Sequence, residues 1–209
     1  MSQTKSHVLE QRSADLFRRA WLTDEARALI HPKQNAGDLL LDLASHDLHD
    51  DACQCLAYAM PNRSAVWWLC QCLWHERARL AGPSNHAALE AAVEWVLHPT
   101  PENVHKAELA SDAAPFESPA RCAANAAFLA GHGPAIDAPV TSERQNLVAQ
   151  LIGGALTLAT VSSSAGTGLT PEQALNLGLD VVRGISRWET ILAAHEQTVT
   201  TKPTTGGQP

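Results

Sequence analysis

The densest group of side chains that could do chemistry lies between positions 46 and 51. His46, His49 and Asp50 can share one face of a helix, and they are ligand types that suit a divalent transition metal. The same stretch also places acidic residues where a helix would begin, and the helix dipole favours negative charge there. We therefore keep His46, His49 and Asp50 as a metal-site hypothesis and favour a helix start as the role of this segment.

Two Cys-Gln-Cys pairs, Cys53 with Cys55 and Cys70 with Cys72, form a second pattern that resembles a metal site. Both pairs lie in stretches with helical patterning, where residues two positions apart point about 200° away from each other. Neither pair can chelate one ion in that conformation, and zinc sites favour cysteines separated by about two to four residues. The sequence predicts that these thiols are small buried hydrophobic side chains, a common use of free cysteine.

A third set of residues, His86, Glu90, Glu94 and His98, recurs every four positions. Metal sites in carboxylate bundles use a Glu-x-x-His spacing, which this set lacks. The apolar residues of the same stretch mark the opposite side as buried, so the row is expected to face solvent. The Ser/Gly-rich run 162–168 lacks the Gly-Lys-Ser/Thr of a phosphate loop. The sequence thus predicts no catalytic residue and no cofactor.

The composition of the chain argues against several kinds of partner. Its 209 residues carry a formal net charge of −7, and 45 % of them are apolar, enough for one sizeable core. No stripe of Lys and Arg is available to neutralise phosphates, so we expect no nucleic-acid partner. The longest apolar stretch, 147–161, is shorter than the ~20 residues that span a bilayer, so no membrane segment is expected. Because an export signal is not recognisable, the five cysteines are expected to stay reduced in the cytoplasm.

Helix start signals recur along the chain, and the alternating pattern of strands is nearly absent. Thr-Pro or Ser-Pro pairs at 100–101, 118–119 and 170–171 place a capping side chain before a proline at the first helical position. The last pair is followed by Gln173, which completes a capping box. These signals predict helices that begin at or next to each pair.

The patterning predicts an all-α fold, a single domain of about eight to nine helices packed as antiparallel pairs in a bundle or a short α-α superhelix. We expect a flexible N-terminus at 1–10, a helical domain at 11–197, and a disordered tail rich in Thr, Gly and Pro at 198–209. The predicted helices, of which the first two can be continuous, span residues 12–22, 24–30, 36–45, 48–60, 62–81, 85–98, 101–113, 118–130, 142–162 and 171–197.

The stretch 62–81 is apolar over most of its helical circumference and carries only a narrow polar stripe. A helix of this kind is buried on several sides, so we expect it at the centre of the molecule, with most of its tryptophans in the core. Gly153 and Gly154 lie in the middle of the predicted helix 142–162 and cost about 1 kcal/mol each relative to Ala. This pair predicts that another helix crosses closely there. The polar stripe consists of Ser64, Gln71, His75 and Arg79.

Several stretches together resemble a known family in their order and spacing. They are the tryptophan-rich stretch 57–68, the residues Trp95-Val96 and Pro99-Thr100, the stretch 118–131 and the stretch 178–184. The chain resembles an uncharacterised family of all-helical bacterial proteins that are often encoded near type VI secretion genes. The resemblance covers about residues 22–188. It implies a genomic neighbourhood, and it carries over no activity and no functional residue.

These observations favour a non-catalytic helical interaction protein, an accessory, adaptor or chaperone-like factor for type VI secretion cargo. The expected partner is a protein, either a secretion effector or a spike component. Two alternatives stay open: a metal-dependent helical-bundle enzyme, and an immunity protein that neutralises a toxin. Loops carry function disproportionately, so the predicted partner-binding residues lie in the acidic segment and in the loop after 131. They are Asp47, Asp50, Asp51, His132 and Pro134.

Overall fold

The computed structural model describes residues 8–11, 18, 20–132, 142–161 and 168–186. These ranges are helical and contain no strand, which confirms the predicted all-α class. None of the helices in the described ranges combines the length and apolarity that crossing a bilayer requires. The elements between residues 24 and 183 are α3 (Asp24–Ala28), α4 (Ala36–Ser45), α5 (His49–Ala59), α6 (Asn62–His75), the 3-10 helix η2 (Arg77–Arg79), α7 (Pro83–Leu97), α8 (Pro101–Ala113), α9 (Pro119–Gly131), α10 (Ser142–Val161) and α11 (Pro171–Arg183).

Side-chain caps fix where the helices begin. The hydroxyl of Thr100 accepts the N–H of Asn103 at 3.3 Å, and Ser118 caps α9 in the same way. Thr170 and Gln173 form the predicted capping box, with reciprocal bonds of 3.2 and 3.0 Å. The predicted starts of α4, α8 and α11 are confirmed to the residue, because the residues next to each start determine where the helix begins.

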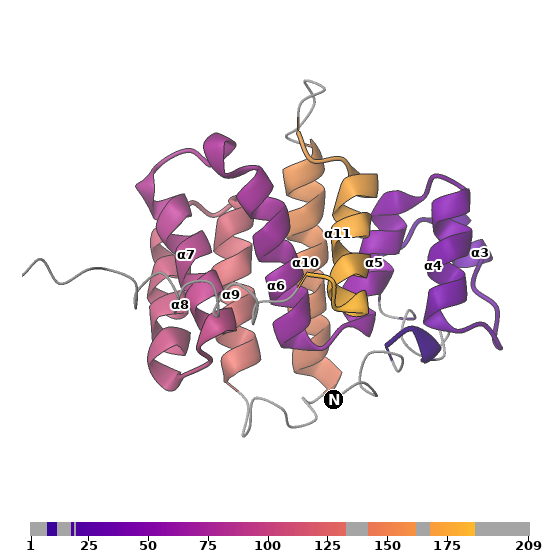
Figure 1. Cartoon of the computed structure of the whole chain (residues 1–209), viewed down its shortest axis with the longest axis horizontal. Coiled ribbons are helices and arrows are strands. Elements are labelled where there is room, and N and C mark those ends of the chain that lie inside the picture. The colour runs from indigo at the N-terminus through magenta and orange to yellow at the C-terminus, as the bar shows by residue number, and fades with distance from the viewer. Residues whose placement is uncertain (1–7, 12–17, 19, 133–141, 162–167, 187–209) are drawn as a thin grey trace, which may run out of the picture.

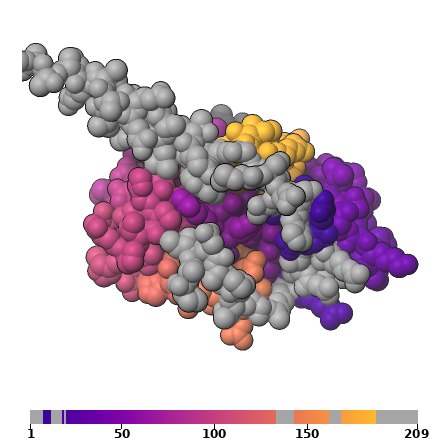
Figure 2. Space-filling view, turned by 60° about the horizontal axis from the view of Figure 1, so that its bottom comes forward, coloured from indigo at the N-terminus to yellow at the C-terminus, as the bar shows by residue number. Residues whose placement is uncertain are grey.

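The helices lie side by side in one elongated array (Figure 1). Sequence neighbours pack on each other from α4 to α5 and from α6 through α10, as predicted for helix pairs. The last helix differs, because α11 packs mainly against α5 and α6 and only slightly against its neighbour α10. On the surface, α11 lies between the indigo-to-violet N-terminal elements and the helices around α8 (Figure 2).

The helix α6 lies at the centre of the molecule, as its sequence predicted. It packs against α7, α9, α10 and α11, and its side chains Trp68, Leu69 and Leu73 are completely buried. Of its tryptophans, Trp67 and Trp68 are in the core, whereas Trp74 is 48 % exposed. The prediction that most of these tryptophans are core residues is therefore confirmed.

Two helices, α6 and α11, end well before their predicted last residues, 81 and 197. The stretch predicted as one helix over 62–81 consists of α6, which ends at His75, followed by the short η2. The helix predicted over 171–197 ends at Arg183, because Gly184 adopts a left-handed conformation with a φ of 70°. The N–H of Gly184 donates to the carbonyl oxygens of Asp180 and Val181, which is a typical glycine C-cap.

The two glycines in α10 face different surroundings. At Gly153 an added Cβ would collide with the side chain of Gln54, so α5 crosses closely there, as predicted. At Gly154 an added Cβ would meet nothing within 4 Å. The expectation of a close helix crossing thus holds for Gly153 and is wrong for Gly154.

Candidate functional site

The predicted patch at 46–51 is a turn between two helices. His46 caps the end of α4, and its ring Nδ1 lies 2.8 Å from a backbone oxygen of that helix. Asp47 has a φ of 59°, and His49 begins α5. In the part of the chain that the structure describes, no three His, Cys, Asp or Glu side chains come together to hold a metal ion. His46, His49 and Asp50 are therefore not gathered into a metal site.

Asp51 has a structural role and not the surface role predicted for it. The residue is only 5 % exposed, and its carboxylate accepts the N–H of Thr23 at 2.8 Å and the hydroxyl of Thr23 at 2.9 Å. The same hydroxyl caps α3 by accepting the N–H of Ala26. This pair fastens the start of α3 to α5, which removes Asp51 from the predicted partner-binding surface.

The other two acidic residues of the segment, Asp47 and Asp50, are exposed. Partial desolvation raises the pKa of Asp50, the carboxylate of Asp51 raises it further, and His49 lowers it. These two side chains remain available at the surface of the α4–α5 turn.

The residues predicted after 131 lie at another element. His132 is exposed at the end of α9, and its ring meets the ring of Phe128 edge-on, with the centroids 4.4 Å apart. Its backbone oxygen accepts a hydrogen bond from Arg144 of α10. Pro134 lies outside the described residues. His132 thus belongs to the α9–α10 end, and the acidic pair to the α4–α5 turn.

Four of the five cysteines are buried, as predicted from their place in helices. Burial raises the pKa of the thiols of Cys53, Cys55, Cys70 and Cys72, to about 12 for Cys70. A thiol needs to ionise before it can attack or bind a metal, so these four side chains are inert at neutral pH. They contribute packing.

The row from His86 to His98 lies on the outer side of α7, as predicted. Glu90 pairs with Arg77 at 2.7 Å, and Glu94 lies 3.6 Å from Lys106 of α8. Both pairs are exposed, so each stabilises the protein little. The row connects α7 to η2 and α8 and does not form a metal site.

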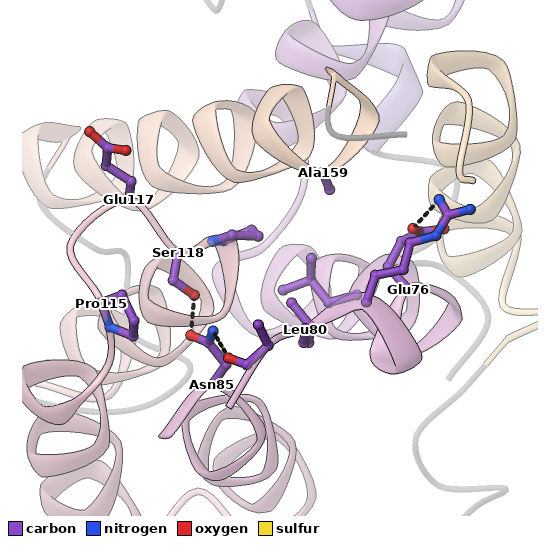
Figure 3. A pocket seen from close by; sticks show the side chains of 11 residues that line it. Glu76, Leu80, Asn85, Pro115, Glu117, Ser118 and Ala159 are labelled. Carbon is purple, nitrogen blue, oxygen red and sulfur yellow. Dashed lines mark hydrogen bonds and ion pairs between the residues drawn. The ribbon is translucent and has the colours of Figure 1, made fainter. Parts of the chain in front are cut away.

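A hollow of about 360 Å³ lies where the end of α6, η2 and the start of α9 meet (Figure 3). The hydroxyl of Ser118 donates to Asn85 at 2.5 Å, and Arg79 pairs with Glu76 at 2.9 Å. The second carboxylate oxygen of Glu76 accepts the N–H of Leu169 at 2.8 Å. The buried polar groups of this hollow are bonded to one another, so they hold the fold together.

Two adjoining hollows, which we together name the α6–α11 groove, lie between α6 and α11 beside α7. Its apolar end has a volume of about 630 Å³, and its polar end has a volume of about 430 Å³. Both ends are lined by His75 and Leu177, so the two hollows adjoin each other at these side chains. The apolar end is also lined by Trp67, Cys70, Gln71, Trp74, Val93 and Ser186. The polar end is also lined by Glu76, Gly168, Leu169, Gln173, Asn176 and Asp180.

Two polar atoms from side chains of the apolar end are buried without a partner. They are the indole Nε1 of Trp67 and the amide Oε1 of Gln71, one helical turn apart on α6. The amide nitrogen of Gln71 donates to Ser186, so only its oxygen is unpaired. A buried unpaired polar group costs about 1–3 kcal/mol, and native proteins keep few of them. The described residues contain two more such atoms, on Asn62 and Trp95, and neither residue lines the groove.

The mouth of the apolar end carries an exposed aromatic ring. Trp74 is half exposed, and the guanidinium of Arg77 lies 4.3 Å from the centre of its ring. The same guanidinium pairs with Glu90 at 2.7 Å, so it is held over one face of the indole. A fixed aromatic ring beside a cavity is typical of the residues that dominate binding energy.

Three contacts set the distance between the two walls of the groove. The indole N–H of Trp68 donates to the backbone oxygen of Ala174 on α11 at 2.7 Å. At Gly178 the helices approach so closely that an added Cβ would lie 2.6 Å from Leu56 and 2.7 Å from Trp68. Glu76 binds the backbone N–H just before α11 and so fixes where that helix starts.

A further hollow, of about 500 Å³, lies along α10. Trp21, Leu147 and Leu158 line it and are exposed. None of the unpaired buried atoms belongs to a residue that lines this hollow. The α6–α11 groove is therefore the stronger candidate for a binding site.

The groove is absent from the sequence-based predictions. Gln71 and His75 belong to the polar stripe noted on the otherwise apolar stretch 62–81, and this stripe is the sequence signal for the groove. The opposite wall has no such signal. It comes from a helix more than 100 positions later in the chain, since Trp68 and Ala174 are 106 positions apart.

A comparison with curated proteins and a comparison with solved structures each found no match. A comparison with family models matched residues 39–182, which include the residues of α6, α7 and α11 that line the groove. The match agrees with the resemblance to an uncharacterised family noted in the sequence. More than half of the chain is matched, and the chain therefore belongs to this family of unknown function (DUF6931).

Proposed function

We propose that the protein is a non-catalytic binding factor whose α6–α11 groove receives a short segment of a partner protein. The observation that carries this proposal is an apolar cavity of about 630 Å³ between two helices, with the half-exposed ring of Trp74 among its lining residues. Two of the lining side chains also carry buried polar atoms without a partner, Trp67 Nε1 and Gln71 Oε1, and a bound segment supplies their missing bonds once these side chains turn toward the cavity.

The chemistry of the apolar end fits a peptide. A peptide group carries one C=O acceptor and one N–H donor, which complement the indole N–H of Trp67 and the amide oxygen of Gln71. The cavity of about 630 Å³ lies within the usual range of ligand pockets. The exposed ring of Trp74 adds aromatic contact area at its mouth.

The resemblance to proteins encoded near type VI secretion genes directs the choice of partner. On that basis we propose an accessory, adaptor or chaperone-like factor, with a secretion effector or a spike component as the protein that it binds. A groove that covers a short segment suits a factor that holds cargo until it is handed on. The mechanism requires binding and release and no covalent step.

A pull-down from the native host tests this function. The full-length chain, expressed at its native level, is compared with Val93→Arg, which places a charged side chain in the apolar end of the groove. The control is Leu109→Arg, an identical kind of change at an exposed position of α8. We expect a protein encoded near the gene to be recovered with the wild type and with the control, and to be lost with Val93→Arg. Equal recovery by all three proteins contradicts the proposal.

A further inference from the structure

The segment that the groove receives has a recognisable chemistry, if the proposed function holds. We infer that it carries a large apolar side chain with a lysine or arginine one or two positions away. The apolar side chain occupies the end lined by Trp67, Trp74 and Val93, and the cation lies at the polar end. This inference rests on the proposed function and deepens it by naming what the groove selects.

The charges at the polar end carry the inference. Two carboxylates line it, Glu76 and Asp180. Glu76 is occupied, because one oxygen accepts the N–H of Leu169 and the other pairs with Arg79. Asp180 forms no side-chain hydrogen bond or ion pair within the described residues. The polar end therefore presents one free carboxylate.

No cation in the described ranges forms an ion pair with that carboxylate, and this includes Arg183, three positions further along α11. Arg77, the nearest Arg to the apolar end along α6 and η2, is held by the ring of Trp74 and by Glu90. His75 lines both ends of the groove, and Glu76 lines the polar end. Charge complementarity therefore favours a ligand with a positive side chain at this end.

The distance between the two ends of the groove determines how far apart the apolar and the basic residue lie in the bound segment. Leu177, shared by both ends, and Asp180 are three positions apart on α11, a rise of about 4.5 Å. An extended peptide advances about 3.3 Å per residue. An apolar side chain beside Leu177 and a cation beside Asp180 therefore belong to residues that are one or two positions apart.

Selection from a random-peptide phage library with the full-length chain as bait tests the inference. We expect the enriched sequences to place Lys or Arg one or two positions from Trp, Phe, Leu or Ile. The charge-reversing variant Asp180→Lys is expected to replace this preference with Asp or Glu. The matched control is Asp112→Lys, an exposed position on α8, which changes the net charge equally and is expected to keep the basic preference.

A synthetic copy of the best enriched peptide gives the quantitative readout. Replacing its basic residue by Glu is expected to weaken binding to the wild type about tenfold, the low end for close interfacial charge pairs, and Asp180→Lys is expected to restore it. An unchanged preference in Asp180→Lys, or the same switch in Asp112→Lys, overturns the inference.

The outcomes separate this inference from the proposed function. Enrichment that is lost with Val93→Arg but shows no basic preference supports the binding groove and overturns its charge selectivity. Enrichment that is indifferent to Val93→Arg overturns both. Two further outcomes assign the groove to the chain itself and also overturn the inference. One is that a peptide of this chain's own residues 187–197 binds more tightly than the enriched peptide. The other is a doubling of molecular mass at the assay concentration.

Discussion

At the scale of single residues, two adjacent tryptophans differ in one hydrogen bond. Trp67 and Trp68 are both buried, and only the indole N–H of Trp68 has a partner, the backbone oxygen of Ala174. Replacing each by Phe removes the same atoms, so the loss of packing is similar at both positions. The difference between the two variants isolates the hydrogen bond.

We expect Trp68→Phe to lower the free energy of unfolding by about 1–3 kcal/mol more than Trp67→Phe does. Trp68→Phe loses a bond to α11, whereas Trp67→Phe removes a buried donor that has no partner in the free protein. Urea denaturation of the two variants and the wild type measures the difference. Equal losses would show that the N–H of Trp67 is satisfied in the free protein.

The buried thiols predict how stability depends on pH. Burial raises the pKa of Cys70 from its ordinary value of 9.0 to about 12 in the folded chain. The unfolded chain therefore ionises first as the pH rises. The stabilising contribution of this group is complete below pH 9 and is lost between pH 9 and 12, at about 1.4 kcal/mol per pH unit.

Between pH 9 and pH 10 we expect the unfolding free energy of Cys70→Ala to fall less steeply than that of the wild type, by about 1.4 kcal/mol per pH unit. The slope is the quantity to compare, because the cavity left by the substitution costs the same at each pH. Cys122→Ala, at a thiol that is only partly buried, is expected to change the slope less. A wild-type slope in Cys70→Ala would mean that its thiolate is not penalised by the fold.

At the scale of helices, the local sequence predicts starts better than ends. Thr100, Ser118 and Thr170 carry their caps in the adjacent residues, so the starts of α8, α9 and α11 were predicted to within one position. The ends depend on distant contacts and on backbone conformation. The hydrogen bond that the N–H of Leu169 donates to Glu76 joins two segments far apart in sequence. Gly184 ends α11 by a left-handed turn.

The packing of α11 on α6 yields a prediction from two helical glycines. At Gly178 an added Cβ would press on Leu56 and Trp68, whereas at Gly154 it would meet open space. We expect Gly178→Ala to destabilise the protein by about 1–3 kcal/mol through overpacking. Gly154→Ala is expected to stabilise it by up to about 1 kcal/mol, because Ala favours the helix. Thermal unfolding of both variants checks the signs, and a stabilising Gly178→Ala would contradict the close approach of α11.

At the scale of the whole molecule, the sequence predicted the fold class and most of the elements but not the candidate groove. The segment 46–51 suggested a metal site because residues of metal-ligand type are close together in its sequence. In the structure the segment is the turn between α4 and α5, with Asp51 buried. The groove needs two walls, and only one carries a signal, the stripe with Gln71 and His75. The other wall arrives through the pairing of α11 with α5 and α6, which no local pattern encodes.

The proposed partner segment fills the α6–α11 groove and satisfies the N–H of Trp67. The most direct measurement follows the indole N–H resonances of the full-length protein by NMR while the recovered partner segment is added. We expect the Trp67 signal to shift and its hydrogen exchange to slow, because its donor gains an acceptor. The signal of Trp95, which is also unpaired but lies outside the groove, is predicted to stay in place. Binding that shifts the signal of Trp21 and leaves those of Trp67 and Trp74 unchanged would place the segment at the hollow along α10 and not in the groove.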